Sequence, residues 1–142
     1  MTELFLIAHI AGRGVAIPTS RVDSVVDIGE IVAVPRAEEC IKGLAALRSR
    51  VVTVIDTGVA LGLAPLGRTT RAVITLVDGH HYAVLVDTLE DVASFERRPL
   101  SFGVALGPGW RGVATGLVER DGEPLLVIDP TALIPVALGQ AA

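Results

Sequence analysis

Hydrophobic residues along this chain fall in short runs, and turn-forming residues separate the runs. Two runs, at 4–10 and 15–18, flank Gly12-Arg13-Gly14, a pattern that predicts a β-hairpin. Two more, at 72–77 and 82–86, flank Asp78-Gly79 and predict a second hairpin. The remaining runs predict strands at 22–28, 44–47, 51–55, 90–95, 113–118 and 124–128, and a helical turn or two at 38–42, 57–61 and 130–133.

A weak internal repeat relates the two halves of the chain at an offset of 67 residues. In this alignment Ile7 meets Ile74 and Gly12 meets Gly79. Later in each half the pattern recurs with small shifts, as KGLA at 42–45 against RGVA at 111–114 and VID at 54–56 against VID at 127–129. Because turns and strands recur together, two halves built on one plan are the simplest explanation.

The repeat predicts a mostly β protein in which each half contributes five short strands, as in a small closed barrel that hides its edge strands. The whole chain, 1–142, is expected to form one domain. Its first subdomain is placed at 10–66, and its second at 67–136, where the N-terminal strand can also belong. Residues 63–70 are expected to connect the halves, 95–110 to form a long loop, and 137–142 to be a tail.

Composition narrows the class of protein. The chain has 142 residues, of which 51% are hydrophobic, so a sizeable core is available. Its net charge is −4 and no run of Lys and Arg exceeds two residues, which disfavours nucleic-acid binding. No apolar run approaches the roughly 18 residues of a membrane span, and no basic segment precedes the first apolar run. With a single cysteine, the sequence predicts a cytoplasmic protein that does not insert into a membrane.

The residues that could carry chemistry do not form a convincing active site, and no cofactor or metal is expected. Cys40 is the only thiol and is best explained as a packed residue. His80 and His81 follow a turn and are interpreted as solvated, because adjacent strand residues point to opposite faces. Asp56 and Asp129 each end a VID strand before a predicted helical turn, which favours N-caps over acid–base catalysis.

Residues 34–63, VPRAEECIKGLAALRSRVVTVIDTGVALGL, carry the most informative pattern. The segment resembles the CheW-like family, the coupling proteins of bacterial chemotaxis. That resemblance implies two five-stranded SH3-like barrels around a shared hydrophobic core, with few short helices and no enzymatic activity. The family's residues are kept without a gap at Val34, Pro35, Ala37, Ile41, Gly43, Leu47, Arg48, Val51, Val54 and Asp56.

The resemblance also implies partners and the residues that meet them. Family members join chemoreceptors to a histidine kinase: the first barrel binds the kinase's regulatory domain, and the receptor's cytoplasmic tip docks between the barrels. The second barrel can meet another such domain. By position, the contact strand falls at Val22, Ser24 and Val25, the basic helper at Lys42 and the key arginine at Arg48. From the residue alone, Arg48 is equally well explained as a solvated turn residue, and the resemblance favours the interface.

Several positions depart from the family pattern and keep alternatives open. Ser24 replaces a Glu, Ala46 an Asn, Ser49 a Gly and Thr53 a Pro. The loss of Gly at position 49 is expected to alter the turn beside Arg48, because Gly accepts positive φ and Ser does not. Two alternatives follow: a divergent CheW-like scaffold of a signalling array outside chemotaxis, and a β-barrel that binds a small molecule.

Overall fold

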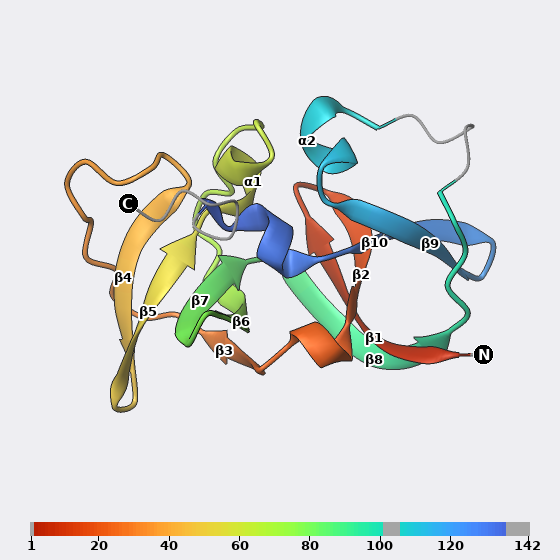
Figure 1. The fold of residues 1–142 in the computed structure, drawn as a ribbon, viewed down its shortest axis with the longest axis horizontal. Helices are drawn as coiled ribbons and strands as arrows, with labels where there is room; N and C mark the ends of the chain where they lie inside the picture. The colour runs from red at the N-terminus through yellow and green to blue at the C-terminus, as the bar shows by residue number, and fades with distance from the viewer. Residues whose placement is uncertain (1, 101–105, 136–142) are drawn as a thin grey trace.

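The computed structural model describes residues 2–100 and 106–135, and most of these residues lie in ten strands (Figure 1). Three short helical elements lie between strands, and a fourth follows the last strand. In chain order the elements are β1 (Glu3–Ile10), β2 (Arg13–Pro18), η1 (Thr19–Arg21), β3 (Ser24–Asp27), β4 (Ile41–Leu47), β5 (Arg50–Ile55), α1 (Thr57–Ala60), β6 (Arg71–Val77), β7 (His80–Leu85), β8 (Thr88–Phe95), α2 (Pro108–Arg111), β9 (Ala114–Arg120), β10 (Glu123–Ile128) and η2 (Pro130–Leu133).

The strands form two five-stranded sheets, which lie side by side in Figure 1. One has the order β8-β1-β2-β10-β9 and is called the terminal lobe, because it contains the strands nearest both chain ends. The other has the order β3-β6-β7-β5-β4 and is called the central lobe. The two orders match strand by strand. β3, β4 and β5 correspond to β8, β9 and β10, and the β6–β7 hairpin corresponds to the β1–β2 hairpin. The expected repeat is therefore a repeat of structure.

The two repeats exchange their hairpins. The β1–β2 hairpin pairs with β8 and β10 of the second repeat, and the β6–β7 hairpin pairs with β3 and β5 of the first. The expected subdomain boundaries at 10–66 and 67–136 therefore do not follow the sheets, because β6 and β7 belong to the central lobe. The physical reason is that a repeat in sequence fixes equivalent strands but not which copy each strand pairs with.

In each lobe, one isolated bridge joins the chain beyond one edge strand to the opposite edge strand. Val32 exchanges two backbone hydrogen bonds with Leu44, of 2.8 and 2.9 Å, and Arg98 does so with Leu117, both of 2.8 Å. These paired closures agree with the expected barrel plan. They also correct one detail of the repeat, because Leu44 corresponds to Leu117. KGLA at 42–45 therefore matches TGLV at 115–118 rather than RGVA at 111–114.

The lobes share a hydrophobic core, as the resemblance implies. One buried cluster contains Leu6 and Ile17 from the terminal lobe and their repeat equivalents Val73 and Val84 from the central lobe. Burying equivalent faces of the two hairpins against each other removes apolar surface from water at about 25 cal/mol per Å². Each lobe also has a cluster of its own, around Val52 and Ile74 in the central lobe and Phe5 and Leu125 in the terminal lobe.

Three local predictions were wrong. The expected helix at 38–42 is a turn followed by the start of β4, in which Ile41 N donates to Glu38 O. The first hairpin turns at Ala11 and Gly12, both with positive φ, so Arg13 and Gly14 belong to β2. The region expected as a loop at 95–110 contains α2, while its residues 101–105 and the expected tail 137–142 lie outside the described residues. Among the described residues, no helix is long and apolar enough to cross a membrane.

Candidate docking surfaces

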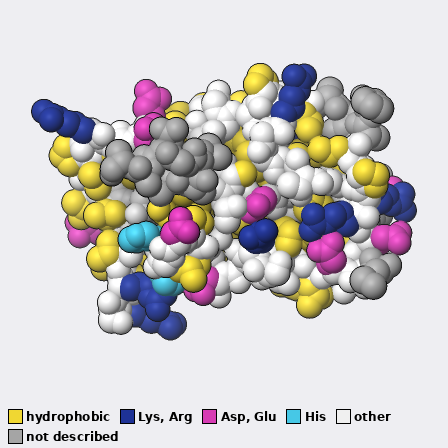
Figure 2. Space-filling view, viewed as in Figure 1, with side chains coloured by type: hydrophobic (Ala, Val, Ile, Leu, Met, Phe, Trp, Pro, Cys, Tyr) yellow, Lys and Arg dark blue, Asp and Glu magenta, His cyan; other side chains and the backbone are white. Residues whose placement is uncertain are grey.

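The open end of the central lobe contains a hollow of about 470 Å³. Strand β3 forms one wall and the β4–β5 hairpin forms the other, with Val52 and Ile74 at its floor. Figure 2 shows Lys or Arg and His side chains gathered at this end of the lobe. The residues that line it are Asp23, Ser24, Val25, Val26, Leu47, Arg48, Ser49, Arg50, Val52 and Ile74.

Three of the five residues carried over from the family converge on this hollow. Ser24 and Val25 lie on β3, and Arg48 lies in the β4–β5 turn on the opposite wall. Val25 is a valine with 39% of its surface exposed, so its position is not explained by burial in the core. The structure therefore brings together two parts of the chain that are separate in sequence.

The other two carried-over residues lie elsewhere. Val22 is half-buried and packs against the shared core cluster, so its side chain contributes to the hydrophobic core. Lys42 lies near the far end of β4, roughly 17 Å along the strand from Leu47, the residue before Arg48, at about 3.3 Å per residue. Its ammonium donates to Gly67 O at 3.4 Å. Neither residue lines the hollow.

Arg48 adopts a conformation that is unusual for a side chain of its type. Its φ is 56°, in the left-handed region, whereas Ser49 is not among the residues with positive φ. In each of the other three hairpin turns, Gly takes the second position with φ of 80°. The expected change of the turn at Ser49 is thus present at the second position. The positive φ of Arg48 is not part of this change, because Ala11, Asp78 and Asp121 have φ of 50–51° at the first position of the other three turns. Among the described residues, no hydrogen bond or ion pair holds the Arg48 guanidinium, which points to an exposed cation.

Sequence reasoning missed Asp23, Leu47 and Arg50 as parts of this surface. Arg50 contacts the ring nitrogen Nε2 of His81, so His81 is not simply a solvated turn residue. A guanidinium only donates, so in this contact the Nε2 atom of His81 is the acceptor. None of the three has a sequence feature that separates it from ordinary strand or turn residues. Only the alternation of side chains along β4 and β5 could have indicated which of them share a face of the hairpin.

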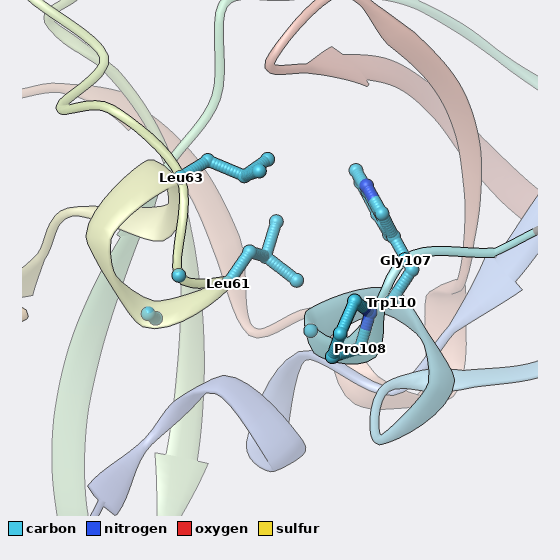
Figure 3. A pocket seen from close by; sticks show the side chains of 8 residues that line it. Leu61, Leu63, Gly107, Pro108 and Trp110 are labelled. Atoms are coloured by element: carbon cyan, nitrogen blue, oxygen red, sulfur yellow. The ribbon is translucent and has the colours of Figure 1, made fainter.

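A second hollow, of about 410 Å³, lies between the lobes. Figure 3 shows Leu61 and Leu63, beside α1, facing Pro108 and Trp110 of α2. Trp110 is 6% exposed, and the Arg13 guanidinium stacks over its ring at 5.4 Å from the centroid. A Cβ at Gly109 would overlap the backbone of Leu61, so only glycine permits this close approach. The groove is lined mainly by apolar groups of Ala60, Leu61, Gly62, Leu63, Gly107, Pro108, Gly109 and Trp110.

The groups considered for chemistry have structural roles. Cys40 packs against the cluster of Ile55 and Tyr82, and burial raises the pKa of its thiol, with Glu38 adding to the effect. A raised pKa keeps the thiol protonated, which is the opposite of what a nucleophile requires. Asp56 caps α1 as predicted, because its carboxylate accepts from Val59 N at 3.2 Å. Among residues 2–100 and 106–135, no group of three or more metal-ligating side chains occurs.

Comparison with known proteins identifies relatives of the whole fold. A family model described as "CheW-like domain" matches residues 4–137. Among solved structures, the scaffolding protein TtCheW from Thermoanaerobacter tengcongensis is similar, with a TM-score of 0.76 and 20% identity over 90% of this chain and 89% of that chain. At this identity the structural likeness shows the fold alone. No curated protein matches the sequence.

Proposed function

The chain belongs to the CheW-like domain family, and from this premise we propose that it is an adaptor that couples chemoreceptors to a histidine kinase through protein–protein contacts. The family and its structural neighbour are scaffolding proteins rather than enzymes. Both proposed partners act on the cytoplasmic side of the membrane, so the proposal places the adaptor in the cytoplasm. An adaptor needs two separate docking surfaces, and the described residues offer two hollows.

The hollow of the central lobe is the proposed contact with the kinase's regulatory domain. The observation that carries this proposal is the convergence of Ser24, Val25 and Arg48 on one surface. An apolar floor with a guanidinium at its rim suits a reversible interface, because the floor supplies burial and the arginine supplies directed hydrogen bonds. Arginine is enriched in protein interfaces relative to the rest of the surface.

The groove between the lobes is the proposed contact with the helical tip of the chemoreceptor. Leu61 and Leu63 face Trp110 across an apolar cleft, which suits the apolar stripe of a helix. Leu63 is 45% exposed, so a helix that covers it would remove apolar surface from water. Because this groove and the central-lobe hollow have no lining residue in common, both partners could be held at once.

Titration calorimetry with the regulatory domain of the histidine kinase from the same organism tests the kinase contact. Wild type is expected to bind with a Kd in the micromolar range, about −8 kcal/mol. Arg48→Glu should weaken binding at least tenfold. Arg68→Glu, an exposed change of the same charge outside the hollow, is the matched control and should bind as wild type does. Equal binding by both variants would remove Arg48 from the site, and no binding by folded wild type would refute the kinase contact.

The receptor contact is tested with a helical-hairpin peptide of the chemoreceptor tip. Leu63→Glu places a charge in the groove and should abolish measurable binding, because the carboxylate would lose its hydration on contact. Leu4→Glu changes a similarly exposed leucine on β1 and should leave binding unchanged. If both variants bind the receptor peptide equally well, the groove is not its docking site.

A divergent scaffold for another signalling array remains the alternative. The observation that favours it is Ser24, which lies in the hollow where the family pattern has a Glu. An array outside chemotaxis has its own histidine kinase, so binding can be compared between the regulatory domains of the two kinases. Preference for the kinase of the other array would support the alternative.

A further inference from the structure

The two lobes provide an internal comparison, because equivalent positions can be matched through strand pairing. Val25 pairs with Val73 in the central lobe, as Val92 pairs with Leu6 in the terminal lobe. Leu47 pairs with Arg50 across one hairpin, as Arg120 pairs with Glu123 across the other. Extending these offsets along the chain makes Glu90 and Arg120 the terminal-lobe equivalents of Asp23 and Leu47. Leu76 pairs with His81 as His9 pairs with Gly14, so His9 is the equivalent of Leu76.

In the terminal lobe these three equivalents form one polar cluster. Arg120 donates through two nitrogens to the Glu90 carboxylate, at 2.9 and 3.3 Å. The Nδ1 atom of His9 lies 3.3 Å from the same carboxylate. A bidentate pair of this kind fixes both distance and orientation, so it ties β8 to β9 at the end of the lobe.

The central lobe keeps the carboxylate but has leucines at the two cation positions. Arg48 and Arg50 line the same hollow, and among the described residues neither makes an ion pair with Asp23. Leu47 stands where the terminal lobe has its arginine, and Leu76 stands where it has its histidine. Asp23 and Leu47 both line the hollow. Within the described residues the Asp23 carboxylate makes no ion pair, and its one hydrogen bond is a long one from Ser24 Oγ at 3.5 Å.

The backbone of Asp23 is nevertheless held in place. Its backbone N–H donates to Ile74 O at 2.7 Å, which continues the pairing of β3 with β6. The exposed side chain therefore starts from a fixed backbone position on the wall of the hollow, opposite the β4–β5 hairpin. A positioned carboxylate beside apolar surface suits a guanidinium, whose methylene chain can pack on Leu47.

We propose that Asp23 determines specificity at the central-lobe hollow by receiving an arginine from the regulatory domain of the histidine kinase. The partner's arginine completes between two proteins the clamp that Glu90 and Arg120 make within this chain. This inference rests on the proposed function. It also explains the departure at Ser24, because the acidic residue of the contact strand stands one position earlier, at Asp23.

Calorimetry with the same kinase domain tests the proposal through two substitutions. Asp23→Asn keeps the size of the side chain and removes its charge, and it should weaken binding about tenfold. Leu47→Arg places an arginine next to Asp23 within the chain. It should also weaken binding about tenfold, because the Asp23 carboxylate then pairs with the introduced arginine instead of the partner's. Leu47→Met keeps the apolar character and should bind as wild type does.

A combined variant separates the clamp from simple obstruction. In the Asp23→Asn background, Leu47→Arg should cost less than twofold, since no carboxylate remains for an arginine to occupy. Raising the salt concentration should weaken wild-type binding more than binding by Asp23→Asn. If circular dichroism shows that Leu47→Arg does not fold, Asp23→Asn and the exposed charge reversal Asp23→Lys decide the question.

The outcomes distinguish this inference from the function on which it rests. If wild type binds and Asp23→Asn binds equally well, the role of Asp23 is refuted and the kinase contact stands. If folded wild type does not bind the kinase domain, the kinase contact is refuted and the partner named for Asp23 with it. Selective loss in Asp23→Asn and Leu47→Arg, with Leu47→Met unaffected, would establish the clamp.

Discussion

Asp56 and Asp129 hold equivalent positions in the two repeats, each directly after a strand and before a short helix. The Asp56 carboxylate accepts from Val59 N at 3.2 Å, and the Asp129 carboxylate accepts from Thr131 N at 3.0 Å. Each therefore satisfies a backbone donor that the helix itself leaves free. The N-caps predicted from the repeated VID segments are confirmed.

Asp56 also binds a segment ten residues away, whereas both hydrogen bonds to Asp129 come from Thr131, through its N–H and its hydroxyl. This difference predicts unequal effects on stability. Both oxygens of the Asp56 carboxylate also lie 3.3 Å from Leu66 N, in the segment that leads to β6. Asp129→Ala should lower the free energy of unfolding by about 1 kcal/mol, the usual value of an N-cap. Asp56→Ala should lower it by about 2 kcal/mol, because Leu66 N loses its acceptor as well. Urea denaturation measures both values. Equal losses would show that the hydrogen bond from Leu66 N to Asp56 adds nothing to stability.

The positive φ of Arg48 predicts a preference for glycine at this position. A residue with a Cβ in the left-handed region is strained by about 1 kcal/mol relative to glycine. Because Arg48 has φ of 56°, Arg48→Gly should be about 1 kcal/mol more stable than Arg48→Ala, although both remove the guanidinium. Arg50→Gly and Arg50→Ala form the control pair, where Ala should be the more stable by about 0.5–1 kcal/mol. Thermal or urea denaturation of the four variants gives the comparison.

The sequence was sufficient for most strands and for the repeat, because apolar runs and Asp-Gly turns report local structure directly. The exchange of hairpins was not predictable in this way, since β6 has similar apolar faces whichever repeat supplies its partners. Helix α2 has only four residues, and its place depends on Trp110 packing into the shared core. Such a short element has little local preference of its own, so tertiary contacts decide it.

The candidate site was predicted only in part. Family resemblance indicated Ser24, Val25 and Arg48, and the structure places these residues around one hollow. Asp23 carries no sequence feature that separates it from other exposed acidic residues. The role proposed for it rests on comparison with Glu90, because Leu47 stands where Glu90 has its arginine partner. The equivalence of Asp23 and Glu90 can be recognised only when the strand registers of both lobes are known.

The ion pair of Glu90 and Arg120 predicts a dependence of stability on pH. The hydrogen bond from Arg120 lowers the pKa of Glu90 below its ordinary value of 4.5; desolvation opposes this, and the charges of Arg120 and His9 support it. A carboxyl whose pKa is lower in the folded state stabilises the fold above its unfolded pKa. This stabilisation is lost as the pH falls through the folded pKa.

The measurement is urea denaturation of wild type and Glu90→Gln between pH 3 and pH 7. Wild type should be the more stable near pH 7, and its advantage should shrink as the pH falls below about 4.5, the unfolded value. Arg120→Leu, which copies Leu47 of the central lobe, is the matched background. In that background Glu90→Gln should produce a much smaller pH-dependent difference. An advantage that stays constant down to pH 3 would contradict the assigned cause.

Gly43 and Gly116 stand at equivalent points in the two lobes, next to the bridges that close the sheets. A Cβ at Gly43 would overlap the carbonyl oxygen of Val32, and φ at Gly43 is 153°, which side chains rarely adopt. A Cβ at Gly116 would lie 2.8 Å from Arg98 O, without a positive φ. Closure of the central lobe therefore depends on glycine more strictly than closure of the terminal lobe.

Gly43→Ala is expected to lower the free energy of unfolding by about 2–4 kcal/mol, because a strained backbone angle and a clash with rigid backbone add together. Gly116→Ala should cost about 1–2 kcal/mol, since only the clash is present. Hydrogen exchange at Leu44 N, which donates to Val32 O at 2.9 Å, should accelerate in Gly43→Ala more than exchange at Leu117 N does in Gly116→Ala. Gly12→Ala tests a turn glycine with φ of 80° and nothing near its Cβ, so it isolates backbone strain from the clash. If Gly43→Ala costs no more than Gly12→Ala, the contact with Val32 does not limit closure of the central lobe.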